Sequence, residues 1–85
     1  MLSNFKLVYK NNLYDFPRCK AKDEKQACAY FSSWLKAFEP NYWVKKYIIL
    51  NLSNGYKINC DFDFISKTGR KYFNKIIKEY NLWLF

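Results

Sequence analysis

The chain has 85 residues, of which 51% are hydrophobic and 26% are charged, and its formal net charge is +8. This length fits one domain, residues 1–85, and this composition is typical of a folded protein and not of a disordered tail. The chain contains no His, so catalysis by a Ser-His-Asp or Cys-His system is excluded, and we expect a protein that is not an enzyme.

The positive charge comes with a shortage of acidic residues. Glu occurs only as Glu24, Glu39 and Glu79. A shortage of acids along the whole chain favours a negatively charged partner, which is nucleic acid, a nucleoprotein or an acidic protein surface.

The three cysteines, Cys19, Cys28 and Cys60, are odd in number and share no C-x-x-C spacing. We therefore expect reduced thiols, no metal site, no cofactor and a cytoplasmic location. Neither a signal peptide nor a stretch long enough to span a bilayer is evident, so we expect no membrane partner.

The first elements are predicted to be two strands and a helix. Residues 5–9 have strand character, and a second strand is expected from Leu13 to Cys19, where Pro17 either confines it to a sheet edge or ends it early. Asp23 is the expected N-cap of a helix, with Gln26 three residues later, and Pro40 ends that helix. Its predicted core stripe is Ala27, Tyr30, Phe31, Trp34 and Phe38.

The run from Tyr14 to Phe31 resembles the strand-then-helix opening of HicB-type antitoxins. The pattern is general, and neither a function nor any residue role is carried over from it.

A hairpin is predicted in the middle of the chain, with strands from Tyr42 to Leu52 and from Tyr56 to Ile65 around Ser53-Asn54-Gly55. Two registers compete. A two-residue turn at Asn54-Gly55 would pair Ile49 with Cys60.

A three-residue loop would instead pair Ile48 with Cys60 and Val44 with Phe64, and would make one face almost wholly apolar. The other face would then hold Lys45 opposite Asp63 and Asn51 opposite Lys57. Because a one-residue slip turns every side chain to the opposite face, we expect the three-residue loop.

The last element is a predicted helix capped by Ser66 or Thr68. Its expected buried stripe is Phe73, Ile76, Ile77, Tyr80 and Trp83 or Leu84. The fold class is therefore α+β, with a small antiparallel sheet of three to four strands and two helices on one face. The order is ββαββα, or βαββα if the first hairpin does not form.

Asp61 and Asp63 are the only pair of residues that suggests a magnesium site, since strand alternation would place both carboxylates on one face. Lys45 and Lys57 are expected beside them. We therefore predict cross-strand ion pairs and no metal.

Two surfaces are candidates for binding. A basic cluster at the start of the last helix would contact phosphates, because free backbone N–H groups and the helix dipole favour an anion there. The predicted nucleic-acid contacts are Lys67, Arg70, Lys71, Lys75, Lys78, Lys45 and Lys57. The second surface is an open sheet face on which Trp43, Tyr47 and Ile49 would stack bases or anchor a protein partner.

These features favour a non-catalytic basic module, a monomer or homodimer, that binds nucleic acid or a nucleoprotein through both surfaces. The alternative is a small protein-binding inhibitor of mobile-element or phage type. Such a protein, antitoxin-like, anti-restriction or anti-CRISPR-like, would block a nucleic-acid-handling enzyme by stoichiometric binding.

Overall fold

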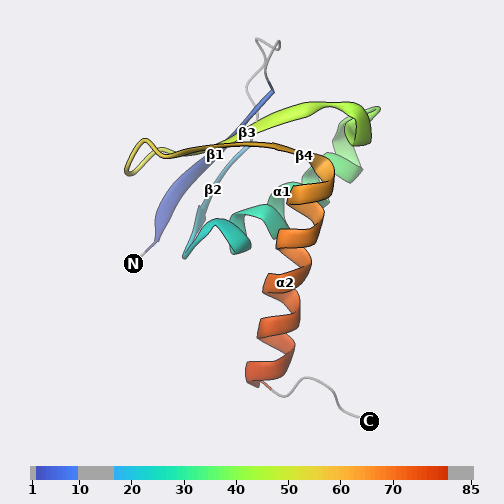
Figure 1. Ribbon diagram of the computed structural model, residues 1–85. Coiled ribbons are helices and arrows are strands. Elements are labelled where there is room, and N and C mark those ends of the chain that lie inside the picture. Colours follow the sequence, from blue (N-terminus) through green and yellow to red (C-terminus); the bar gives the residue numbers. More distant parts are fainter. Residues whose placement is uncertain (1, 10–16, 81–85) are drawn as a thin grey trace.

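A computed structural model describes residues 2–9 and 17–80, which form an α+β fold of order ββαββα. The sheet order is β2-β1-β3-β4, and every neighbouring pair is antiparallel. Both helices lie on the same side of the sheet (Figure 1), so the predicted fold class is confirmed. The elements are β1 (Ser3–Tyr9), β2 (Arg18–Ala21), α1 (Glu24–Phe38), the short 3-10 helix η1 (Tyr42–Val44), β3 (Lys46–Asn51), β4 (Lys57–Asp61) and α2 (Phe62–Tyr80).

The first hairpin forms, with a later second strand than predicted. Strand β2 begins at Arg18, directly after Pro17, whose carbonyl accepts a hydrogen bond from the backbone N–H of Leu7 at 3.2 Å. Residues 13–16 of the predicted strand lie outside the described residues.

Helix α1 begins and ends where local signals predict. The side chain of Asp23 accepts a hydrogen bond from the Gln26 N–H at 3.0 Å, and Gln26 Oε1 accepts one from the Lys22 N–H at 2.8 Å. These two bonds resemble a capping box, except that the Gln26 side chain accepts from the residue before the cap and not from the cap itself. The helix ends at Phe38, two residues before Pro40.

The core stripe of α1 differs from the predicted one. Ala27 and Phe31 are buried as expected and Trp34 is half-buried, but Tyr30 and Phe38 are 42% and 69% exposed. Their places are taken by Cys28, Ala29 and Leu35. The buried face is turned in this way because the small residues Cys28 and Ala29 face α2, where the backbone of Gly69 comes very close.

Both predicted registers of the central hairpin are wrong. Ile49 pairs with Ile58 and Tyr47 with Cys60, which leaves a four-residue loop over residues 52–55. Two asparagine side chains build this loop. Asn51 Oδ1 accepts a hydrogen bond from the Ser53 N–H, and Asn54 Oδ1 accepts one from the Tyr56 N–H, both at 2.9 Å.

The new register reverses the predicted faces of β3. Tyr47 and Ile49 are each 1% exposed and Asn51 is buried beside them, whereas we had expected these side chains on the open face. They pack with strand residues Phe5 and Leu7 in the core. The other core residues are Ala21, Ala27, Cys28, Phe31, Leu35 and Ile65.

Helix α2 starts four residues before the first predicted cap, Ser66. The chain leaves β4 at Asp61 and enters the helix at Phe62, so the predicted second strand is shorter than expected. Of the predicted buried stripe, Ile76 and Ile77 are half-buried, whereas Phe73 is 51% exposed. The Tyr80 side chain and residues 83 and 84 of the predicted stripe lie outside what the structure describes.

Candidate nucleic-acid interface

The sheet face opposite the helices carries the main concentration of positive charge on the strands. Since side chains alternate along a strand, burial of Phe5, Leu7, Tyr47 and Ile49 on the helix side turns their neighbours to the other side. We call this surface the open sheet face. Its residues are Asn4, Lys6 and Val8 of β1, Arg18 and Lys20 of β2, Lys46, Ile48 and Leu50 of β3, and Lys57, Asn59 and Asp61 of β4.

One row of the open sheet face runs straight across the sheet. Arg18 on edge strand β2 is opposite Lys6, Lys6 is opposite Leu50, and Leu50 is opposite Lys57 on edge strand β4. With neighbouring strands about 4.8 Å apart, the three intervals from Arg18 to Lys57 span about 14 Å at the backbone. An apolar centre of Val8, Ile48 and Leu50, all half-buried, lies between the cations.

The open sheet face holds five cations and one carboxylate. Within the described residues, Lys6, Arg18, Lys20 and Lys57 have no carboxylate within ion-pair distance. The carboxylate belongs to Asp61, which lies 3.9 Å from the amine of Lys46. This face therefore keeps a net positive charge of four.

Asp61 is fixed by the start of α2. Its Oδ1 accepts a hydrogen bond from the Phe64 N–H at 2.9 Å, the interaction of a helix N-cap. This bond, helped by nearby Lys46, holds the pKa of the Asp61 carboxyl below its usual range. Asp61 therefore carries its negative charge at neutral pH.

The predicted basic cluster does not lie at the start of α2. Because the helix begins at Phe62, its first turn holds Asp63 and no cation. Lys67 pairs with Asp63 at 3.1 Å, and Lys75 pairs with Glu79 at 3.8 Å. Arg70, Lys71 and Lys78 are exposed further along the helix, where they are not beside the free N–H groups that prompted the prediction.

The two predicted strand cations have different environments. Lys45 is half-buried, forms an ion pair with Glu39, and places its amine 4.9 Å from the ring centroid of Tyr9. The Lys45 amine therefore makes its contacts within the protein and is not presented to a ligand. Lys57 is exposed on the open sheet face, as its predicted role requires, although it is opposite Leu50 and not Asn51.

The three predicted partner-binding residues do not form one surface. Tyr47 and Ile49 belong to the core, and the Tyr47 hydroxyl donates a hydrogen bond to the Tyr42 carbonyl at 3.1 Å. Trp43 is 61% exposed, but it lies in η1 and not on a strand. Among the described residues, burial therefore keeps Tyr47 and Ile49 from the exposed stacking surface that we predicted.

Asp61 and Asp63 do not share a strand face, because one ends β4 and the other lies in α2. Their partners are Lys46 and Lys67, where we had predicted Lys57 and Lys45. Among the described residues, no three His, Cys, Asp or Glu side chains are grouped closely enough to hold a metal ion.

Four cations of the open sheet face were missed from sequence: Lys6, Arg18, Lys20 and Lys46. For three of them, the alternation of apolar and cationic residues predicts the face. Lys6 lies between Phe5 and Leu7, and Arg18 and Lys20 alternate with Cys19 and Ala21. Lys46 was not identifiable in this way, since its face depends on the hairpin register.

In the part of the chain that the structure describes, neither helix has the length and apolar character needed to cross a membrane. No protein-family model matches the chain, and no curated protein and no solved structure matches it.

Proposed function

We propose that this protein is a non-catalytic module that binds nucleic acid on its open sheet face. The observation that carries the proposal is the row formed by Arg18, Lys6 and Lys57 across the whole width of the sheet. A row of cations across a sheet fits the regularly spaced charges of a phosphate backbone.

The repulsion within this row supports a polyanion as the ligand. Lys6 and Arg18 are directly opposite each other on neighbouring strands, and like charges in that arrangement destabilise a sheet. A bound phosphate backbone would remove this repulsion and would also release its own counterions. Both effects favour binding, and both depend on the same cationic residues.

The proposal is tested by the salt dependence of binding to a fluorescent single-stranded oligonucleotide. If Lys6, Arg18, Lys20 and Lys57 each contact a phosphate, the slope of log K against log salt is about −2.8, and affinity falls about fifty-fold between 50 and 200 mM salt. Binding that is indifferent to salt would refute the proposal.

Paired variants identify the face that binds. Arg18→Gln with Lys57→Gln removes both ends of the row and is expected to reduce the magnitude of the slope by about 1.4. The matched control, Lys71→Gln with Lys78→Gln, removes two exposed cations from α2 and is expected to leave the slope unchanged. If the control changes the slope and the first pair does not, binding occurs on α2 instead.

A second candidate function is a protein-binding inhibitor, and the exposed turn after α1 favours it. Phe38, Trp43 and Val44 are 69%, 61% and 68% exposed within seven residues. Exposed Trp is a frequent anchor of protein interfaces. Trp43→Ala is then expected to weaken a stoichiometric protein complex by about 2 kcal/mol. In a pull-down from the native host, a protein partner that stays bound after nuclease treatment would favour the inhibitor over the nucleic-acid-binding module.

A further inference from the structure

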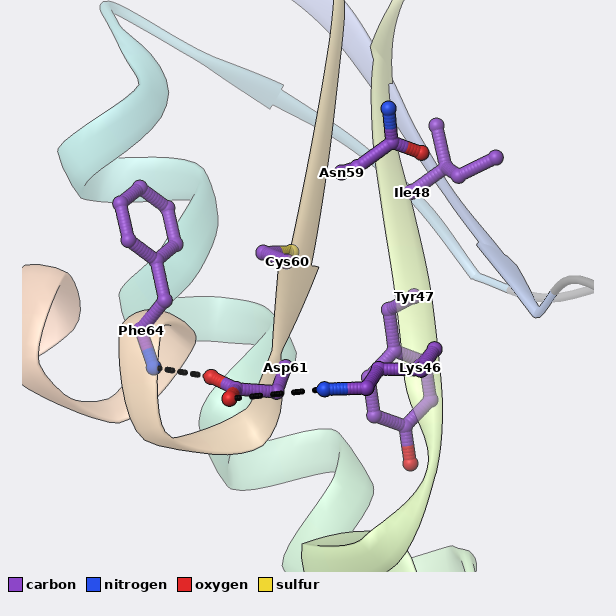
Figure 2. Close-up of a pocket in the computed structure, with 7 residues that line it drawn as sticks. All are labelled: Lys46, Tyr47, Ile48, Asn59, Cys60, Asp61 and Phe64. Carbon is purple, nitrogen blue, oxygen red and sulfur yellow. Dashed lines mark hydrogen bonds and ion pairs between the residues drawn. The ribbon is translucent and has the colours of Figure 1, made fainter.

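A pocket lies at one corner of the open sheet face, where β4 passes into α2. It has a volume of about 590 Å³ and is lined by Lys46, Tyr47, Ile48, Asn59, Cys60, Asp61 and Phe64 (Figure 2), of which Tyr47 is buried. This volume is within the range of small-molecule sites. The pocket adjoins the cationic row, since Ile48 and Asn59 are opposite each other one pair along from Leu50 and Lys57 on the same face.

Phe64 gives this pocket the exposed aromatic side chain that the open sheet face lacks. None of the residues that we assign to the open sheet face is aromatic. The Phe64 side chain is 42% exposed and stands beside β4 in Figure 2. Its backbone is held by the hydrogen bond to Asp61, so the ring is presented by a fixed helix start and not by a loose loop.

The polar groups of the pocket distinguish a base from a phosphate. The Asn59 side chain is exposed and offers an amide, which donates and accepts hydrogen bonds as base edges require. The Asp61 carboxylate repels a phosphate from the pocket itself but accepts hydrogen bonds from an amino group. The Lys46 amine, 3.9 Å from Asp61, lies at the rim, where a neighbouring phosphate would pass.

We propose that this pocket takes one unpaired nucleobase, with its ring against Phe64 and its edge toward Asn59, from a single strand that crosses the open sheet face. This inference rests on the proposed function, and it narrows the ligand to single-stranded nucleic acid. Aromatic stacking supplies affinity that does not depend on salt, whereas the cationic row supplies affinity that does.

The test compares two oligonucleotides of equal length and charge, a single-stranded 12-mer of deoxyadenosine and a 12-mer of abasic sites. The wild-type protein is expected to bind the base-bearing strand about ten-fold more tightly, the effect of stacking one base. Phe64→Leu is expected to bring the two affinities together while leaving the affinity for the abasic strand unchanged. The matched control, Phe73→Leu, changes another exposed aromatic residue of α2 that is not part of this pocket and is expected to keep the ten-fold preference.

Asn59→Ala provides a second variant, because an exposed strand residue can be replaced without loss of folding, and it is expected to reduce the preference at least three-fold. Equal binding of the two strands by the wild-type protein would overturn the base pocket and leave the cationic row standing. Absence of binding to either strand would overturn the proposed function and the base pocket together. A preference that survives in both Phe64→Leu and Asn59→Ala would show that a base binds elsewhere.

Discussion

Gly69→Ala is expected to destabilise the fold, although alanine is the better helix former. A Cβ atom at position 69 would lie 2.8 Å from the Cα and 2.9 Å from the backbone N of Ala29. Ordinary contacts begin at 3.4 Å, so α1 and α2 would have to separate by about 0.6 Å, and a backbone neighbour cannot rotate away. Overpacking costs about 1–3 kcal/mol, and alanine returns about 1 kcal/mol of helix propensity.

Because the three nearest neighbours of the added atom are all backbone atoms of α1, we expect the upper part of that range and a net loss of about 2 kcal/mol in the free energy of unfolding. For a domain of this size the loss lowers Tm by about 10 °C, which a thermal melt followed by circular dichroism measures directly. Asn74→Ala is the matched control, since Asn74 is exposed on the same helix and only the propensity changes. A Gly69→Ala variant as stable as the wild type would refute the close helix crossing.

Three further predictions concern the cap, the thiols and the hairpin register. Asp23→Ala removes the N-cap of α1 and is expected to lower the free energy of unfolding by about 1 kcal/mol in urea denaturation. Burial raises the pKa of the Cys28 and Cys60 thiols to about 12 from an ordinary value of 9.0, so only the unfolded chain ionises between these values. Stability is therefore complete below pH 9 and falls as the pH rises. The buried Cys28 thiol accounts for about 1 kcal/mol of this loss at pH 10, and the partly exposed Cys60 thiol contributes less because solvent screens its charge. A urea midpoint that Cys28→Ala leaves equally dependent on pH would contradict this. The double variant Ile48→Cys with Asn59→Cys is expected to form a disulfide under mild oxidation, because these positions are opposite each other. Mass spectrometry detects the bond. Ile48→Cys alone should not bond to Cys60, which the register of the three-residue loop would have placed opposite it.

The features that sequence predicted well are those decided within a few residues. Asp23, Gln26 and Pro40 set the ends of α1 by contacts inside one helical turn, and such contacts need no knowledge of the rest of the fold. The order of strands and helices followed from the same kind of local pattern. The base pocket, in contrast, combines β3, β4 and the first turn of α2, and no local pattern brings these together.

The hairpin register was mispredicted because its loop is built by side chains and not by the glycine alone. Gly55 does have a positive φ of 78°, which the three-residue loop also required. The deciding contacts are the hydrogen bonds from the Ser53 and Tyr56 N–H groups to Asn51 and Asn54, which lengthen the loop by one residue. Burial of the Asn51 side chain is tolerated because its carboxamide oxygen accepts one of these hydrogen bonds.

The cations of the neighbouring strands determine which side of β3 faces the helices, which the hydrophobic residues of β3 alone do not. Residues 47–50 are all apolar, so hydrophobicity alone allows either face of β3 to be buried. Ile49 is opposite Leu7, and Leu7 is fixed in the core by its alternation with Lys6. A register that placed Lys57 on the same face as Ile49 would bring an ammonium toward the helices, where desolvation is costly. The observed register instead turns Lys57 to the face of Lys6 and Arg18. The desolvation cost that keeps these cations out of the core thus also gathers them on the one sheet face where an anionic strand can reach them.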